Sequence, residues 1–197
     1  MILPLTPDIR YLHQLAWRPA QFAHPLWLAA AGVNTESYCY GRSQLLDTAL
    51  NAELNRLRNF PQQALPAVLS QQQQCQIVAS ERLSARCLAL GLVHLQCDDY
   101  LRFRSYRQSL SPLLSEDDIQ QLMGMGYRGH LPARLNPQQL PAVALRLGQS
   151  LAHGARGDDV VWRAMSISLP PLTRALSLPR ALSLSVDHWL TRLERLL

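Results

Sequence analysis

The residues whose spacing most suggests chemistry are three glycines in the segment 124–129, which match the GxGxxG pattern of dinucleotide-binding loops. That pattern binds a pyrophosphate where it follows a strand, opens a helix and is followed by an acidic residue about 20 positions later. Here a helical pattern precedes the glycines, Leu131-Pro132 follows them, and the next acidic residue is Asp158. We therefore expect a helix C-terminus with Gly124 or Gly126 near a left-handed cap, and no nucleotide.

Carboxylates and histidines could also form a catalytic or metal site. Three aspartate pairs could bind magnesium or act as acid and base, namely Asp98-Asp99, Asp117-Asp118 and Asp158-Asp159. Each pair lies at a predicted helix start, where the helix dipole favours carboxylates, so we interpret them as capping residues. The six histidines form no HExxH pattern, and GxxxxGK[ST] and GxSxG motifs are also missing from the sequence. We expect no catalytic residue, no bound metal and no cofactor, and therefore a protein that is not an enzyme.

The cysteines and the hydropathy pattern indicate a cytoplasmic protein. Cys39, Cys75, Cys87 and Cys97 are too far apart for CxxC motifs, and Cys75 and Cys87 lie among apolar residues, where a free cysteine acts as a small hydrophobe. The first five residues do not have the charged start of a signal peptide. No apolar run reaches the roughly 18 residues of a membrane span, so no transmembrane helix is expected.

Composition predicts the fold class. Leucine makes up about a fifth of the 197 residues, and β-branched and aromatic residues are few, which favours helices over sheets. We predict an all-α protein with a single compact multi-helix domain over residues 1–197 and an irregular N-terminal segment in the first forty. All 19 basic residues are arginine, and the net charge is +5. Because these arginines are dispersed, we attribute them to codon bias more than to a nucleic-acid site, whose basic residues usually cluster.

Apolar residues at helical spacing predict the individual helices. A leucine stripe begins at Ser43 and should end near Asn59, before Pro61. The last segment, residues 186–197, is amphipathic and should pack on the protein's own core or on a partner. The remaining helices are expected at about 73–95, at 100–106, from a Ser115–Asp118 capping box through Met123, at 137–153, after Asp159 and at 186–197.

Three segments of the chain together resemble one known family. They are the segment 17–28, with its aromatic, small and His24-Pro25 residues, the segment 88–94 around Leu-Gly-Leu, and the segment 162–170 that begins with Trp162 and ends at a proline. In order and spacing they are similar to the SctK (YscK, OrgA) family of the type III secretion sorting platform. The resemblance covers most of the chain, although the glutamine run 71–74 and the segment 174–185 have no match in it.

The resemblance implies a cytoplasmic adaptor at the cytoplasmic face of the inner membrane. Its expected partners are the cytoplasmic domain of the inner-membrane ring protein and the pod component of the platform. We predict that Arg102, Arg104 and Arg107 bind an acidic partner, on a helix whose residues Tyr100, Leu101, Phe103 and Tyr106 face inward. A solvated face with local pairing to Asp98 and Asp99 stays an open alternative for these arginines. We predict that His24, Trp27 and Trp162 are structural anchors. A basic, helical, nucleic-acid-binding regulator stays an alternative, since the sequence pI is near 9.4, although nucleic acid is not the expected partner.

Overall fold

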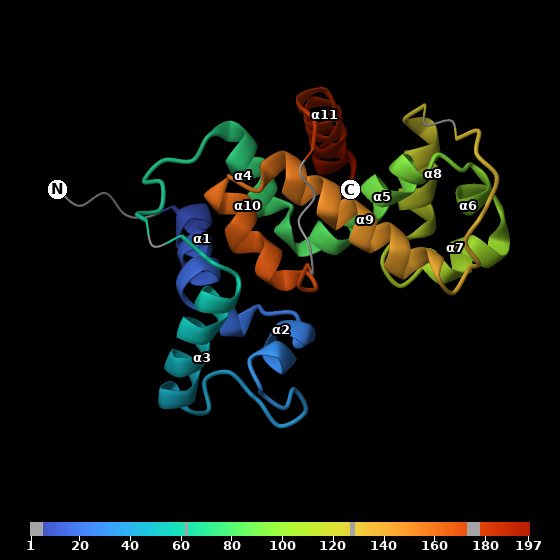
Figure 1. The fold of residues 1–197 in the computed structure, drawn as a ribbon. Coiled ribbons are helices and arrows are strands. Elements are labelled where there is room, and N and C mark those ends of the chain that lie inside the picture. The colour runs from blue at the N-terminus through green and yellow to red at the C-terminus, as the bar shows by residue number, and fades with distance from the viewer. Residues whose placement is uncertain (1–5, 62, 127–128, 173–177) are drawn as a thin grey trace. The chain divides into compact units, whose positions relative to one another are not determined.

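The computed structural model describes residues 6–61, 63–126, 129–172 and 178–197, in which helices are joined by loops (Figure 1). The described residues contain no strand, which confirms the predicted all-α class. The α-helices are α1 (Pro7–Trp17), α2 (Pro25–Ala30), α3 (Gln44–Leu57), α4 (Gln71–Val78), α5 (Leu83–Leu95), α6 (Asp99–Arg102), α7 (Arg104–Leu110), α8 (Glu116–Gly124), α9 (Leu140–Arg156), α10 (Val160–Met165) and α11 (Arg180–Leu196). The described residues also form the short 3-10 helices η1 (Pro19–Gln21), η2 (Ser80–Arg82) and η3 (Ser166–Ser168).

Backbone contacts divide the chain into two compact units. Unit 1 comprises Met1–Ser80 and Gly157–Pro171, and unit 2 comprises Glu81–Arg156 and Leu172–Leu197. Each unit is therefore built from two separate stretches of the sequence. The single domain expected from chain length stays a prediction.

Unit 1 packs helix α1 against α3, α4 and α10. Helix α1 begins with Thr6, whose hydroxyl accepts a hydrogen bond from the backbone N–H of Ile9, and Pro7 fits the first turn because its missing N–H would have no helical partner there. Its buried face places Leu12 and Leu15 in the core, with the indole of Trp162 from α10. Burial of these apolar side chains is the main force that holds the helices of unit 1 together.

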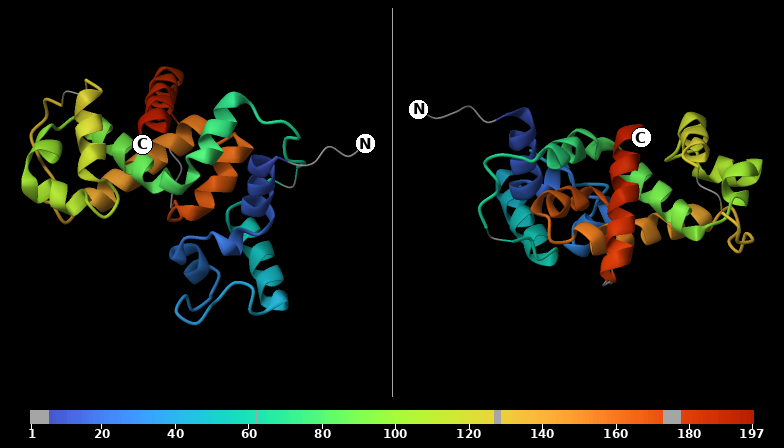
Figure 2. Two further views of the ribbon diagram at one scale, coloured as in Figure 1. Left: turned by 180° about the vertical axis from the view of Figure 1, so that it is seen from behind. Right: turned by 90° about the horizontal axis from the view of Figure 1, so that it is seen from above.

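Unit 2 is built on the close packing of α5 against α9, which run side by side in both views of the ribbon (Figures 1 and 2). Nearly the whole of α5 is buried, as a central helix requires. Small residues allow the approach, since Gly91 lies against the backbone of Ala144 and Gly148 lies against that of Cys87. Helices α6, α7 and α8 lie together at one end of this unit (Figure 2).

Helix α11 packs on α5 and α9 within unit 2. Its apolar stripe buries three residues, Val186, Leu190 and Leu193. The buried guanidinium of Arg156 on α9 forms ion pairs with Asp187, at 2.6 Å from its Nε, and with Glu194. The closing amphipathic segment therefore packs on the protein's own core, which was one of the two possibilities left by the sequence.

The prediction of one continuous helix at 73–95 is wrong. The structure divides this segment into α4, the short turn η2 and α5. Of the residues between the two apolar runs, Glu81 and Arg82 are exposed, Ala79 is half-buried and Ser80 is buried. Because Ser80 lies at helical spacing from the buried Ile77 and Leu83, the pattern of buried positions does not reveal the break. The glutamine run forms the first turn of α4, where Ser70 and Gln73 make a capping box. Cys75 on α4 is exposed instead of buried, whereas Cys87 on α5 is buried as predicted.

Several predicted helix starts are confirmed by their hydrogen bonds. Ser115 and Asp118 form the capping box that opens α8, and the Asp159 carboxylate accepts from the backbone N–H of Val161 at the start of α10. Pro141 lies in the first turn of α9, where a proline is tolerated. Among the described helices, none combines the length and the apolar character that crossing a bilayer requires.

Candidate functional site

The three arginines predicted to bind a partner lie at the α6–α7 junction of unit 2, and they differ in their surroundings. Arg102 pairs with Asp98 one turn earlier, at 3.1 Å between Nη2 and Oδ2. Arg107 pairs with Glu116, at 2.6 Å between Nη1 and Oε1. The side chain of Arg104 makes no ion pair or hydrogen bond with the residues that the structure describes. Of the three, Arg104 is thus the one without an ion pair to any described residue.

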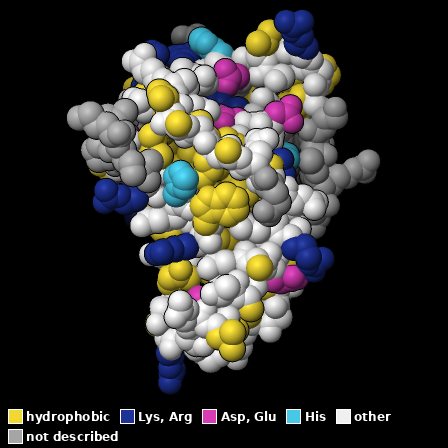
Figure 3. Space-filling model, turned by 90° about the vertical axis from the view of Figure 1, so that its left-hand side faces the viewer, with side chains coloured by type: hydrophobic (Ala, Val, Ile, Leu, Met, Phe, Trp, Pro, Cys, Tyr) yellow, Lys and Arg dark blue, Asp and Glu magenta, His cyan; other side chains and the backbone are white. Residues whose placement is uncertain are grey.

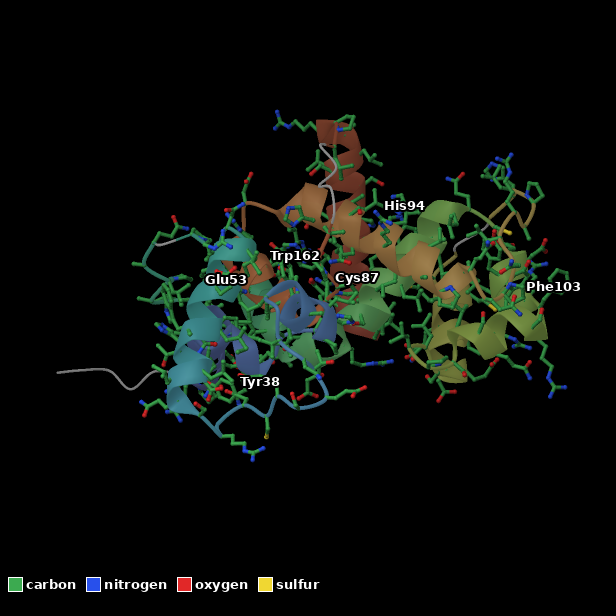
Figure 4. The ribbon with its side chains drawn as sticks, turned by 60° about the horizontal axis from the view of Figure 1, so that its bottom comes forward. Tyr38, Glu53, Cys87, His94, Phe103 and Trp162 are labelled. Atoms are coloured by element: carbon green, nitrogen blue, oxygen red, sulfur yellow. The ribbon has the colours of Figure 1, made fainter. Side chains whose placement is uncertain are left out.

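Phe103 corrects the prediction that all apolar residues of this segment face inward. Its side chain is 55% exposed, at the edge of unit 2 (Figure 4), because the segment is two helices joined at an extended Phe103 (ψ 134°) instead of one continuous helix. Tyr100 and Leu101 are buried, as predicted. An exposed phenyl ring between two arginines is a feature that the helical pattern alone did not predict. We call the surface formed by Arg102, Phe103 and Arg104 the Phe103 surface.

Two tyrosines hold the α6–α7 junction in place. The rings of Tyr100 and Tyr106 meet edge to face, with 5.0 Å between their centroids. The Tyr100 hydroxyl accepts hydrogen bonds from the backbone N–H groups of Arg134 and Leu135, and the Tyr106 hydroxyl donates to the Leu135 carbonyl at 2.8 Å. The exposed Phe103 therefore lies on a backbone that hydrogen bonds hold in place, so this segment would lose little conformational entropy when a partner binds.

Charge is distributed unequally between the units. The sequence of unit 1 contains six arginines and six carboxylates, whereas that of unit 2 contains thirteen arginines and eight carboxylates. The whole net charge of +5 thus belongs to unit 2. On the face drawn in Figure 3, dark-blue arginine side chains stand apart from one another and form no continuous stripe.

His24 and Trp27, both predicted to be anchors, connect α2 to the segment after α10. The backbone N–H of His24 donates to the Ile167 carbonyl at 2.9 Å, and the Trp27 indole N–H donates to the Leu169 carbonyl at 3.0 Å. His24 is also the N-cap of α2, because its ring Nδ1 accepts from the backbone N–H of Leu26. Partial burial lowers the pKa of His24. Trp162 is 2% exposed, inside unit 1 (Figure 4). The anchoring roles stay predictions.

Unit 1 also contains a pocket of about 710 Å³ that the sequence did not suggest. It lies between the end of α1, the loop before α3 and one face of α3 from Gln44 to Asn55. Its lining residues are Trp17, Arg18, Tyr40, Gly41, Gln44, Asp47, Thr48, Asn51, Ala52 and Asn55. Because these residues come from two segments about twenty positions apart, no local spacing could reveal them.

Comparison with known proteins decides the family. A family model described as a type III secretion system subunit matches residues 10–171. The chain belongs to this family. No curated protein and no solved structure matches it. The prediction of a type III secretion protein is therefore confirmed at the level of this family, and the narrower SctK assignment is a proposal.

The matched residues of this secretion subunit include both the Phe103 surface and the pocket of unit 1. Helix α11 follows the matched range.

The glycine pattern of the secretion subunit lies where a helix ends. Gly124 is the last residue of α8, and Gly126 has a positive φ of 75°, a conformation that favours glycine. Gly129 approaches the backbone of Gln96 so closely that a β-carbon would lie 2.4 Å from the Gln96 carbonyl carbon. Its N–H donates to the Asp98 carboxylate. These glycines thus have structural explanations, in keeping with the expected helix C-terminus.

Within the described ranges, no group of three or more His, Cys, Asp or Glu side chains is placed to hold a metal ion. All four cysteines lie in these ranges and carry free thiols. Burial raises the pKa of the Cys87 thiol to about 12, so it is protonated and unreactive at neutral pH.

Proposed function

We propose that this type III secretion subunit is a non-enzymatic adaptor of the SctK kind. In this proposal it links the cytoplasmic domain of the inner-membrane ring protein to the pod component of the sorting platform, at the cytoplasmic face of the inner membrane. Family membership supports a role in secretion, and the three similar segments at 17–28, 88–94 and 162–170 support the narrower assignment.

The observation that carries a binding role is the Phe103 surface. Phe103 exposes more than half of its side chain, and the neighbouring Arg104 has no partner among the described residues. Aromatic residues and arginine are the types that contribute most at protein interfaces, where an aromatic ring supplies buried area and a guanidinium binds carboxylates. The partner of this surface should therefore present an apolar cavity bordered by Asp or Glu.

The net charge of unit 2 fits an acidic partner as well. An excess of positive charge raises the rate of association with an acidic surface and makes that rate sensitive to salt. Arg107 is less suited to this role than the sequence suggested, since its guanidinium is already paired with Glu116. Charge reversal at Arg107 would place two carboxylates together and disturb α8, so Arg104 gives the cleaner test.

The test is a pull-down of the purified full chain with the ring cytoplasmic domain and with the pod protein of the same organism. A Phe103→Ala, Arg104→Glu double variant should bind one of these partners at least about tenfold more weakly, since interface anchors contribute more than 1 kcal/mol each. Circular dichroism should show unchanged helix content, because both side chains are exposed.

Arg195→Glu is the matched control. It reverses the charge of another exposed arginine in unit 2, on α11, and changes the net charge by the same amount. Binding that falls equally in this control would indicate a general charge effect and no defined surface. Undiminished recovery of both partners by the folded double variant would remove the Phe103 surface from the proposal. Failure of the wild-type chain to recover either partner would overturn the adaptor role itself.

Retention on DNA tests the alternative function. Binding through phosphate contacts weakens steeply as salt rises, in proportion to the number of contacts. We expect the wild-type chain to elute from a DNA column at low salt, and specific retention at physiological salt would favour the nucleic-acid alternative.

A further inference from the structure

We propose that the pocket of unit 1 is a second binding site, which takes an extended peptide segment of a protein partner that carries an acidic residue beside an apolar one. The inference goes beyond the proposed function, since it concerns a separate surface and holds whether or not the Phe103 surface binds a ring or pod protein. It rests on the aromatic walls of the pocket, on its unpaired hydrogen-bond donors and on its preformed shape.

The walls of the pocket combine the residue types that dominate protein interfaces. Trp17 exposes 40% of its surface, Tyr40 is partly buried, and both line the pocket beside Arg18. Tryptophan, tyrosine and arginine are the residues most enriched among those that carry binding energy between proteins. A pocket of about 710 Å³ has room for a few side chains.

Hydrogen-bond donors without partners define the chemistry of the ligand. The guanidinium of Arg18 makes no hydrogen bond with the described residues. Asn51 accepts a bond from the backbone N–H of Ala20 through its Oδ1, at 3.0 Å, and its amino group bonds to none of the described residues. These free donors match the acceptors of a peptide, namely a side-chain carboxylate for Arg18 and a backbone carbonyl for Asn51.

The buried carboxylate that lines the pocket already accepts hydrogen bonds from within the chain. Asp47 is 7% exposed, and its two oxygens accept hydrogen bonds from the Tyr38 hydroxyl at 2.7 Å and the Gly41 backbone N–H at 2.8 Å. The positive φ of Gly41, 88°, turns its N–H toward α3. Asp47 thus fixes the loop that carries Tyr40, and Arg18 is the charged lining residue that has no partner among the described residues.

The aromatic wall is held in position before any ligand binds. The ring of Trp17 meets the buried ring of Phe60 edge to face, with 6.1 Å between centroids. The Arg58 guanidinium lies 4.2 Å from the centroid of the Phe60 ring. Asn55, another lining residue, donates to the Ala16 carbonyl at 3.1 Å. A site that is already ordered loses little entropy on binding, which favours a short peptide.

The experiment follows the indole N–H signals of the ¹⁵N-labelled full chain by NMR while the blocked peptide acetyl-Leu-Glu-Phe-Glu-Leu-amide is added. We expect a saturable shift of the Trp17 signal at millimolar peptide or below, with the Trp162 and Trp189 signals unmoved. Acetyl-Leu-Gln-Phe-Gln-Leu-amide, which has the same shape without the charges, should bind about tenfold more weakly.

Two variants separate a defined site from a general charge effect. Arg18→Gln changes an exposed side chain and should reduce affinity for the Glu peptide about tenfold, to the level of the Gln peptide. Arg10→Gln removes another exposed arginine, on α1 and outside the pocket lining, and should bind like the wild type. Equal loss in both variants would overturn the assignment to the pocket.

Three other results would also overturn the proposal. The Trp17 signal could stay unmoved at millimolar Glu peptide. Sodium acetate could shift it at the same concentration as the peptide, which would indicate a site for small anions. The shift could instead follow protein concentration without peptide, which would indicate that a second copy of the chain fills the pocket. Each result leaves the pull-down test of the Phe103 surface unaffected.

Discussion

Gly148 on α9 lies so close to Cys87 on α5 that a β-carbon at position 148 would be 1.7 Å from the Cys87 carbonyl oxygen. One helical turn earlier on α9, the Ala144 carbonyl oxygen would lie 1.9 Å from a β-carbon at Gly91. Both contacts involve backbone atoms, which cannot rotate away as a side chain can. The core of unit 2 therefore depends on two residues that lack side chains.

Alanine at Gly148 or Gly91 should destabilise unit 2 by about 3 kcal/mol or more, because the helices must separate and their core loses contact. Gly124→Ala is the control, since this helical glycine has nothing within 4 Å of the β-carbon position. It should be neutral or stabilising by up to about 1 kcal/mol. Urea unfolding followed by circular dichroism measures all three, and a Gly148→Ala protein as stable as the Gly124→Ala protein would contradict the packing argument.

Arg58 has a comparable structural role in unit 1. Its guanidinium donates to the carbonyls of Leu15 and Ala16 at the end of α1, at 3.2 and 3.1 Å, and to those of Arg163 and Ala164 in α10, at 3.4 and 3.3 Å. Burial, with the nearby charge of Arg163, lowers the pKa of Arg58 to about 9, which still leaves it protonated at neutral pH. One side chain on the segment after α3 thus caps two helix C-termini.

Arg58→Ala should destabilise unit 1 by about 3 kcal/mol, since partly buried carbonyls would lose a charged donor. Arg58→Lys should recover only part of this loss, because an ammonium group cannot span both helix ends as the planar guanidinium does. Arg56→Ala serves as the comparison, as Arg56 lies on the exposed face of α3 with Glu53 and its loss should barely change stability. Thermal unfolding compares the stability of the three variants. An Arg58→Ala protein as stable as the Arg56→Ala protein would show that the carbonyls find other donors.

Features that depend on neighbouring residues were predicted from the sequence better than features that depend on contacts between distant parts of the chain. The Ser115–Asp118 capping box and the left-handed glycine after α8 were predictable because both depend on residues within one turn of the chain. The break at residues 79–82 was not predicted, because the apolar residues on either side agree with one continuous helix. Helical periodicity shows which face is apolar but does not show where the backbone leaves the helix.

The two candidate sites also differ in how much of each the sequence could predict. The arginines around Phe103 could be identified from their proximity in the sequence, but the exposure of Phe103 depends on the break between α6 and α7. The pocket of unit 1 joins Trp17 and Arg18 to residues 40–55 through the hydrogen bonds of Asn51 and Asn55. Such a site exists only after the chain has folded, and no spacing between its residues distinguishes it beforehand.

Trp27 should stabilise unit 1 through both its ring and its indole N–H. The ring packs against the core cluster of Ala20, Leu28, Leu50 and Leu54, and the N–H donates to the Leu169 carbonyl. Trp27→Phe keeps an aromatic ring and loses the hydrogen bond, so we expect a loss of about 1 kcal/mol. Trp27→Ala also loses the packing and should cost about 3 kcal/mol. Urea unfolding measures both, and equal losses in the two variants would show that the ring contributes little.

Acid should weaken unit 1 through His24. Burial lowers the pKa of the His24 ring below its usual 6.5, and Nδ1 must be unprotonated to accept from the Leu26 N–H. Below pH 6.5 the folded state therefore binds fewer protons at this residue than the unfolded state. The stabilisation is complete above pH 6.5 and is lost as the pH falls from there through the folded pKa.

His24→Asn tests this dependence, because an asparagine side chain can cap α2 through its oxygen and does not titrate. We expect the variant to match the wild type at neutral pH and to lose less stability on acidification to about pH 5. His24→Ala removes the cap at every pH and should be less stable than the asparagine variant throughout. Urea unfolding of the three proteins at both pH values gives the comparison. If the wild type and His24→Asn lose equal stability on acidification, other groups account for the acid sensitivity and His24 is only a cap.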